Sequence, residues 1–115
     1  MDFSFSPKVQ ELQTNLLAFM DEHVYPAESV WREQTADGPP HAQPRIMEEL
    51  NAEARRRGLW NLFLPDERFG AGLTNGEYAP LAEITGRSPA LAPEATNCAA
   101  PDTGNMEILA EFGTP

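Results

Sequence analysis

The chain has 115 residues, 18 acidic against 8 basic side chains, and a formal net charge of −10. A chain of this length fits one domain and buries roughly two thirds of its unfolded surface, so it needs no metal or disulfide to fold. The acidic excess argues against nucleic acids and against an anionic membrane surface, because both favour basic proteins.

The single cysteine, Cys98, excludes an internal disulfide and a four-cysteine zinc site, and it fits a reducing compartment. No apolar run approaches the length of a membrane span. The N-terminus has neither the basic start and apolar stretch of a secretory signal nor the arginine-rich character of a transit peptide. We therefore expect a cytoplasmic protein that binds no membrane.

The first predicted helix begins at Ser6-Pro7, a serine N-cap followed by a proline at the first helical position. Pro26 cannot donate to residue 22, so this helix should kink or stop near Tyr25. A short second helix over 27–34 should follow, with Val30 and Trp31 turned inward. Apolar residues recur three and four positions apart along the first helix and predict a buried stripe: Val9, Leu12, Leu16, Phe19, Met20 and Val24.

After an exposed loop over 37–43, Pro44 opens a helix that ends at Gly58, a natural C-cap. Three arginines at 55–57 fall in its last turn, where positive charge offsets the helix dipole. This capping role is preferred over a phosphate site or a contact with protein. The inward face of this helix should comprise Ile46, Met47, Leu50 and Ala54.

The apolar run 59–64 is expected to be an extended segment threaded into a helical core, anchored by Trp60 and Phe63; a short strand is the alternative. Thr74 and Glu77 have the spacing of a capping box and predict a helix that ends near Gly86. Pro80 inside that helix requires a local kink or a frayed first turn.

Three prolines leave a short helix around 90–96, and Asp102 is expected to cap a last helix that ends at Gly113. The apolar residues of this last helix have little left in the chain to cover them. No segment alternates with period two, and there is no internal repeat. We therefore predict an all-α fold, an irregular bundle of four to five helices with long Pro/Gly-rich connections in one domain over 1–115. The last apolar stripe comprises Met106, Ile108, Leu109 and Phe112.

No motif in the chain supports a catalytic or metal site by itself. The glycines at 70, 72 and 76 follow no Val/Ile strand, so a structural turn explains them better than a dinucleotide loop. His23 and His41 lie on different elements, which makes a metal site improbable. Cys98 has no nearby histidine and is read as a packed side chain. The glutamates lie where caps and solvated helix faces would place them, and none is assigned as catalytic.

Several pieces in order nevertheless resemble one family. They are Leu-Thr-Asn-Gly-Glu-Tyr-Ala-Pro-Leu-Ala-Glu at 73–83, Gly-Arg-Ser at 86–88, Ala-Pro-Glu-Ala-Thr-Asn-Cys at 92–98 and Ala-Pro-Asp-Thr-Gly-Asn-Met-Glu at 100–107. This combination resembles the N-terminal helical domain of acyl-CoA dehydrogenases, in the branch whose eukaryotic members can be fused to an aminoglycoside-phosphotransferase-like domain. The likeness is weak before Pro44 and strong from Gly58 onward.

The resemblance implies α,β-dehydrogenation of an acyl-CoA thioester with FAD as the cofactor. It also implies that the base and most flavin contacts lie in a middle β-domain and a C-terminal helical domain, both absent here. The chain alone should then be inactive. Its partners would be the acyl-CoA substrate and these two domains, within a homo-oligomer when full length. Two alternatives stay open: a stand-alone helical interaction module, and a fragment of an acyl-CoA oxidase.

By the same resemblance, the join between the last two helices should line the acyl chain. Small residues at 98–100 would leave room for a ligand, and Asn97 or Thr103 could hydrogen-bond a polar group on the substrate, although both could instead cap backbone ends. The predicted pocket residues are Asn97, Ala99, Thr103 and Met106. No residue is assigned to FAD or to a metal.

Overall fold

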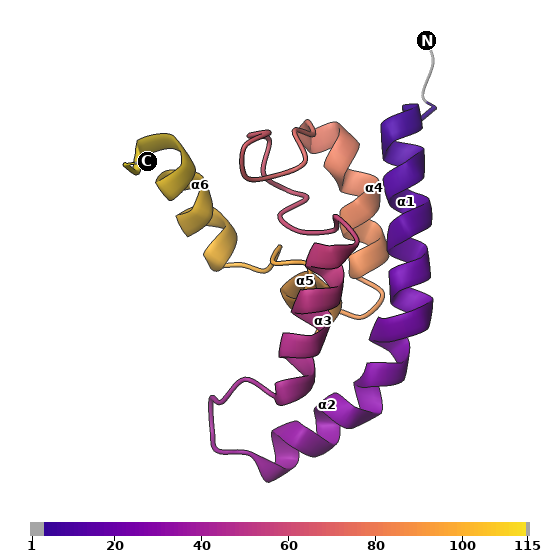
Figure 1. Ribbon diagram of the computed structural model, residues 1–115, viewed down its shortest axis with the longest axis vertical. Coiled ribbons are helices and arrows are strands. Elements are labelled where there is room, and N and C mark those ends of the chain that lie inside the picture. Colours follow the sequence, from indigo (N-terminus) through magenta and orange to yellow (C-terminus); the bar gives the residue numbers. More distant parts are fainter. Residues whose placement is uncertain (1–3, 115) are drawn as a thin grey trace.

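The computed structural model describes residues 4–114, and within that range every regular element is helical (Figure 1). This confirms the predicted all-α fold. The first three elements form one continuous helix, so the described chain holds five separate helices. The elements in order are α1 (Pro7–Phe19), η1 (Met20–Val24), α2 (Tyr25–Asp37), α3 (Arg45–Arg56), α4 (Asn75–Thr85), α5 (Ala92–Ala95) and α6 (Asp102–Phe112).

The long first helix begins as predicted and bends at η1, a single π-helical turn. The Ser6 hydroxyl accepts from the Val9 backbone N–H at 3.3 Å, which confirms the N-cap. Because Pro26 has no N–H to donate, the chain widens ahead of it, and the Tyr25 N–H bonds the Met20 carbonyl five residues back. Figure 1 shows the resulting change of direction between α1 and α2. The predicted kink is confirmed, and the helix continues to Asp37.

The extra residue of the π turn changes which side of α2 faces the core. Ala27 is buried and Trp31 packs against the core, while Val30 is 36% exposed. The prediction that Val30 turns inward is therefore wrong. On α1 the predicted stripe is buried, apart from Leu12, which is half-buried and packs against the same core.

Helix α3 ends at Arg56 with Arg57 as its C-cap, and the next residue, Gly58, adopts a φ of +73°. The Leu59 N–H bonds the Ala54 carbonyl at 2.8 Å, and the Gly58 N–H bonds the Arg55 carbonyl at 3.1 Å. These two bonds form a Schellman motif, which satisfies carbonyls at the helix end. The predicted role of Gly58 in ending this helix is confirmed, at the position after the C-cap Arg57.

The chain then runs without regular structure through the core, as predicted for 59–64. Leu59, Leu62 and Phe63 are buried in this segment, whereas Trp60 is half-buried under the Arg55 guanidinium, 4.1 Å from the ring centroid. The indole therefore packs against the core on one side and against a charged side chain on the other, as expected for an anchor of this segment. Leu59 and Leu62 belong to the core as well, and Phe63 is buried.

The capping box of α4 forms in both directions. The Glu77 N–H donates to the Thr74 hydroxyl at 3.2 Å, and the Thr74 N–H donates to the Glu77 carboxylate at 3.0 Å. Helix α4 packs along α1 and contains Pro80, and α5 packs against α3. The helices α1 to α5 thus enclose the buried core.

Helix α6 differs from the others because it buries no residue. It stands apart at the end of an extended connection in Figure 1. Asp102 does not cap it: Pro101 is already in helical conformation at the N-cap position, and Asp102 is the first helical residue. The prediction of an aspartate cap is wrong because the helix begins one residue earlier than the sequence pattern suggested.

Candidate functional site: an apolar hollow beside helix α6

Two asparagines with left-handed backbones join the 59–64 segment to the end of α5. Asn61 and Asn97 have φ values of 57° and 58°, a region that asparagine tolerates better than most residues. The Asn61 backbone N–H donates to the Thr96 carbonyl at 3.0 Å. The Asn97 Nδ2 donates to Asn61 Oδ1 at 2.7 Å. The positive φ values therefore place two side-chain amides against each other.

This amide pair reaches two further segments. The Asn97 Nδ2 also contacts the Met106 Sδ at 3.2 Å, on the first turns of α6. The Asn61 Nδ2 donates to the Phe69 carbonyl at 3.0 Å. Asn61 thus contacts the end of α5 and the 66–72 turn, and Asn97 contacts α6. The two amides therefore link the end of α5, the 66–72 turn and α6 by polar contacts.

An apolar hollow of about 210 Å³ lies next to this pair. Its walls come from the 61–69 segment on one side and from α6 on the other. Leu64 is buried, whereas Phe69 is 53% exposed at the edge. Asn61 contributes the amide on an otherwise hydrophobic lining. The lining residues are Asn61, Leu64, Phe69, Met106, Leu109 and Ala110.

The four predicted pocket residues fall into two pairs. Met106 lines the hollow, and the Asn97 amide contacts the Met106 sulfur. Ala99 lies half-buried on the connection into α6, and Thr103 lies half-buried on the first turn of α6, where its N–H donates to the Ala99 carbonyl at 3.3 Å. Asn97, Ala99 and Thr103 are not part of the lining of this hollow.

Sequence reasoning predicted only Met106 among the lining residues and missed the other five: Asn61, Leu64, Phe69, Leu109 and Ala110. The only signal for Asn61 was a polar residue inside the apolar run 59–64. Its partner Asn97 is 36 residues away. No periodic pattern spans that distance, so the pairing needs the folded chain.

A second hollow, of about 680 Å³, adjoins the first, because Leu64 and Ala110 line both, and most of its charged side chains are acidic. Asp66, Glu107 and Glu111 line it together with Arg68. The Arg68 Nε donates to Asp66 Oδ1 at 3.0 Å, and this bond holds the pKa of the Asp66 carboxyl below its ordinary value. One arginine against three carboxylates does not fit the pyrophosphate of FAD, so we assign no flavin contact to this hollow.

Cys98 packs against the core close to Tyr78. Its Sγ lies 3.3 Å from the Thr96 carbonyl. Burial raises the pKa of the Tyr78 phenol, and the neighbouring Cys98 raises it further. The contacts of Cys98 with the core fit its interpretation as a packed side chain.

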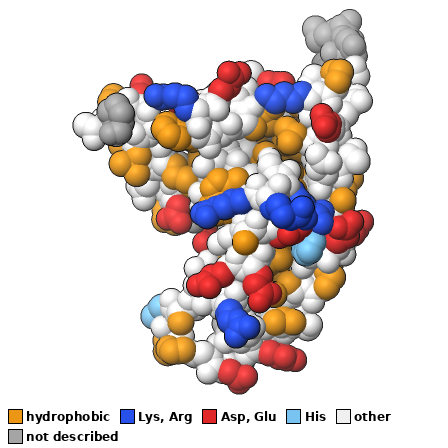
Figure 2. Space-filling view, viewed as in Figure 1, with side chains coloured by type: hydrophobic (Ala, Val, Ile, Leu, Met, Phe, Trp, Pro, Cys, Tyr) orange, Lys and Arg blue, Asp and Glu red, His pale blue; other side chains and the backbone are white. Residues whose placement is uncertain are grey.

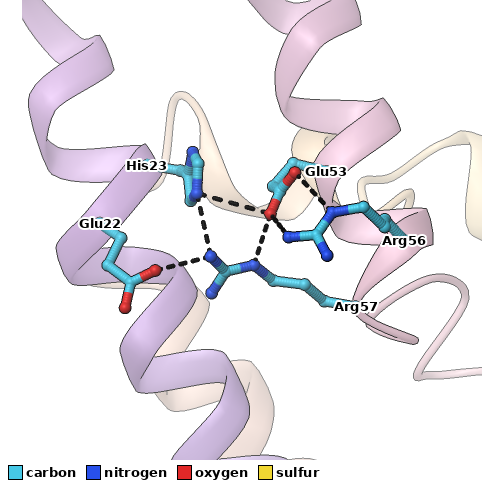
Figure 3. Close-up of polar contacts among 5 residues, drawn as sticks. All are labelled: Glu22, His23, Glu53, Arg56 and Arg57. Atoms are coloured by element: carbon cyan, nitrogen blue, oxygen red, sulfur yellow. Dashed lines mark hydrogen bonds and ion pairs between the residues drawn. The ribbon is translucent and has the colours of Figure 1, made fainter.

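Two of the three arginines at the end of α3, Arg56 and Arg57, belong to an ion-pair cluster (Figure 3), whereas Arg55 lies over the Trp60 ring. Arg57 bonds Glu53 at 2.7 Å through Nε and Glu22 at 2.6 Å through Nη2, and its Nη2 lies 3.0 Å from His23 Nε2. Arg56 also bonds Glu53, and these bonds lower the pKa of the Glu53 carboxyl to about 2. The cluster ties η1 to the end of α3, and Arg56 and Arg57 are thereby held in local ion pairs.

Across residues 4–114, no three His, Cys, Asp or Glu side chains are grouped as a metal site would require. In the same range, no helix combines the length and apolar character needed to cross a bilayer.

Comparison with known proteins gives a consistent set of relatives, although no family profile matches the sequence. The chain is 58% identical over 116 residues to the probable acyl-CoA dehydrogenase FadE2 of Mycobacterium tuberculosis. It is 45% identical to acyl-CoA dehydrogenase family member 10 of Mus musculus and 40% identical to family member 11 of Homo sapiens. These matches cover 99%, 95% and 93% of the chain, but only 28%, 11% and 14% of the relatives.

A solved structure assigned as an acyl-CoA dehydrogenase from Mycobacterium abscessus has the same fold. It superposes with a TM-score of 0.82 at 43% sequence identity. The superposition covers 97% of this chain and 30% of the other. The chain thus spans less than a third of the length of the relatives and of the solved structure that it matches.

Proposed function

Because this chain belongs to the acyl-CoA dehydrogenase family, we propose that it forms part of the wall that encloses the acyl chain of an acyl-CoA thioester. The whole enzyme would catalyse flavin-dependent α,β-dehydrogenation of that thioester. The observation that supports this role is the apolar hollow between the 61–69 segment and α6.

The lining of the hollow suits a hydrocarbon chain. Each methylene that leaves water for an apolar surface gains about 0.8 kcal/mol. Leu64, Met106 and Leu109 offer such a surface, and the flexible thioether of Met106 can adjust to the shape of a ligand. Asn61 and Asn97 restrict the position of Met106, so they would fix the width of the hollow on that side.

We assign the four residues of the α5–α6 join to this wall as a proposal. Met106 would contact the acyl chain directly, and Asn97 would hold Met106 in place or bond a polar group on the substrate. Ala99 lies on the connection before α6 and Thr103 on the first turn of α6, where small side chains would leave space for a longer ligand. None of the four would take part in proton or hydride transfer.

FAD is proposed to bind mainly to regions outside this chain, in keeping with the acidic hollow described above. When bound, the flavin supplies the acceptor for the hydride. The residues described here would bind and orient the acyl chain and exclude water from it. The proposed partners are the middle and C-terminal domains of the same enzyme. The chain alone would be inactive, and the whole enzyme would be a homo-oligomer.

The proposed wall can be tested in a FadE2 hybrid, in which this chain replaces the matched 116-residue segment of the M. tuberculosis relative. Met106→Phe adds a ring to the hollow and should lower kcat/KM for long acyl-CoAs on the order of tenfold relative to short ones. Met106→Leu, which conserves volume, is the matched control. Steady-state assays across a series of chain lengths measure the effect.

The proposal fails if Met106→Phe and Met106→Leu leave the same chain-length preference in a hybrid that retains activity. Ala99→Leu in the same assay tests the outer part of the wall. If Ala99 borders the acyl chain, this variant also shifts the preference towards shorter chains. An unchanged preference would remove Ala99 from the wall.

A further inference from the structure

Met106 is more accessible than the other methionines of residues 4–114. Met20 and Met47 are buried in the core, at 0% and 2% exposed, and Met1 lies outside the described residues. Met106 is half-buried and lines the apolar hollow. Figure 2 shows hydrophobic side chains gathered over the α6 region at the upper left of the molecule. A small reagent can therefore reach Met106 from the hollow, whereas it reaches Met20 or Met47 only when the core opens.

The Asn97 amide holds the Met106 sulfur in a defined orientation. The Asn97 Nδ2 donates to Asn61 Oδ1 at 2.7 Å, and the same nitrogen lies 3.2 Å from Met106 Sδ. A thioether sulfur is a weak hydrogen-bond acceptor with two lone pairs. Because the amide occupies one lone pair, the second is the one that remains open to an electrophile.

Hydroperoxides are the class of reagent that suits this sulfur. The thioether attacks one oxygen of hydrogen peroxide, so a sulfur–oxygen bond forms and the O–O bond breaks. The proton on the attacked oxygen passes to the leaving oxygen, which departs as water. The sulfur loses two electrons and the peroxide gains them. The product, methionine sulfoxide, is polar and chiral at sulfur, and reductases return it to methionine.

Oxidation of Met106 would change the character of the hollow. The new oxygen forms on the lone pair that the Asn97 amide leaves free. It adds a strong acceptor to a lining that Leu64 and Leu109 otherwise make apolar. A hydrocarbon chain that binds there would strip water from this oxygen without replacing its hydrogen bonds. The oxidised hollow should therefore disfavour long acyl chains.

We propose that Met106 is a site of reversible oxidation by hydroperoxides, and that its sulfoxide weakens the binding of long hydrocarbon chains to the hollow. The effect on binding rests on the proposed function. The modification itself rests on the position of Met106 in the hollow and on its contact with Asn97. The contact adds a second expectation: because one lone pair is occupied, one of the two sulfoxide epimers should predominate.

Peroxide treatment of the 115-residue chain tests the site without any measurement of activity. Tandem mass spectrometry follows each methionine and Cys98 separately during a limited reaction with hydrogen peroxide. Met106 should gain one oxygen faster than Met20 or Met47, on the order of tenfold or more. Similar rates at these three methionines would overturn the proposal.

Two classes of methionine sulfoxide reductase, each specific for one epimer, report on the geometry at the sulfur. In the oxidised parent chain, one class should reduce most of the Met106 sulfoxide and the other class little of it. Asn97→Gly removes the amide and tolerates the φ of 58°, so this variant should give a more even mixture. Circular dichroism checks that the variant folds. An even mixture in the parent chain would overturn the role assigned to the Asn97 contact.

The FadE2 hybrid tests the effect on the acyl chain. Mild peroxide treatment that oxidises Met106 should lower kcat/KM for long acyl-CoAs on the order of tenfold relative to short ones, and reductase treatment should restore it. A Met106→Leu hybrid is the matched control, because peroxide acts equally on its other methionines and cysteines. The chain-length preference of this control, whatever its value, should be the same before and after treatment.

Three results in the hybrids overturn the proposal. They are a Met106 that gains no oxygen, a Met106 sulfoxide that leaves the preference unchanged although Met106→Phe shifts it, and an equal effect of peroxide on the Met106→Leu control. The proposed wall fails separately. If Met106 is oxidised and neither the oxygen nor Met106→Phe changes the preference, Met106 does not contact the acyl chain, and the effect assigned to the sulfoxide is lost with the wall.

Discussion

Asn61 is the residue through which the candidate site is built. Its side chain bonds Asn97 and the Phe69 carbonyl, and its backbone bonds Thr96. Its φ of 57° is what turns the amide towards these partners. The side-chain hydrogen bonds of Asn61 and its backbone angle therefore both affect the stability of the fold. Substitutions of Asn61 can separate the two effects.

Asn61→Ala removes both side-chain hydrogen bonds and keeps a Cβ at positive φ. We expect the free energy of unfolding to fall by about 2–3 kcal/mol, from the lost bonds and from the strained backbone. Asn61→Gly loses the same bonds without the strain and should be about 1 kcal/mol more stable than Asn61→Ala. Urea denaturation measures both values. Equal stability of the two variants would show that the positive φ costs alanine nothing here.

At the scale of the element, the sequence predicted what is decided locally. Helix ends were predicted correctly at Ser6, at the pair Thr74 and Glu77, and at Gly58. The hydrogen bonds at each of these ends join residues that are close in the sequence. Val30 was predicted wrongly because the π turn ahead of Pro26 changes the phase of the helix, and periodicity assumes a constant phase.

Substitution by alanine should change stability in opposite directions at two glycines, Gly58 just after α3 and Gly104 inside α6. A Cβ at either Gly58 or Gly104 would meet nothing within 4 Å, so sterics from neighbours are the same in both cases. Gly58 has a φ of +73°, and Gly58→Ala should lower the free energy of unfolding by about 1 kcal/mol.

Gly104 lies inside α6, where alanine has the better helix propensity, so Gly104→Ala should add about 0.5–1 kcal/mol to the stability of that helix. Urea denaturation reports on Gly58→Ala, and amide exchange over 102–112 reports on Gly104→Ala. If alanine lowered stability equally at both positions, the positive φ of Gly58 would not be the reason why Gly58→Ala is destabilising.

At the scale of the whole molecule, the sequence predicted the fold class and the family but not the composition of the hollow. Met106 was predicted from the family likeness, and it lines the hollow. Asn61 and Phe69 were not predicted, because they approach α6 through a segment without periodicity. The exposed stripe on α6 was expected from the sequence because no later apolar segment remains to cover it. The sequence pattern therefore does not determine which residues far apart in the chain come into contact.

The ion-pair cluster between η1 and α3 makes stability depend on pH. Bonds from Arg56 and Arg57 lower the pKa of Glu53 from 4.5 to about 2. A carboxyl with a depressed pKa in the folded state contributes stability above its unfolded pKa. That contribution is complete above pH 4.5 and is lost as the pH falls through about 2. The net charge of −10 acts in the opposite direction, because acid reduces self-repulsion.

Glu53→Gln separates the two effects, because it removes the cluster carboxylate and changes the net charge by only one. We expect the variant to be less stable than the parent at pH 7, with the difference shrinking between pH 4.5 and 2 as Glu53 of the parent is protonated. Glu48→Gln makes the same charge change on the exposed side of α3 and is the control. Thermal unfolding at a series of pH values measures the difference. If Glu53→Gln and Glu48→Gln follow the parent in parallel across this range, the cluster does not couple η1 to α3, and self-repulsion alone sets the response to acid.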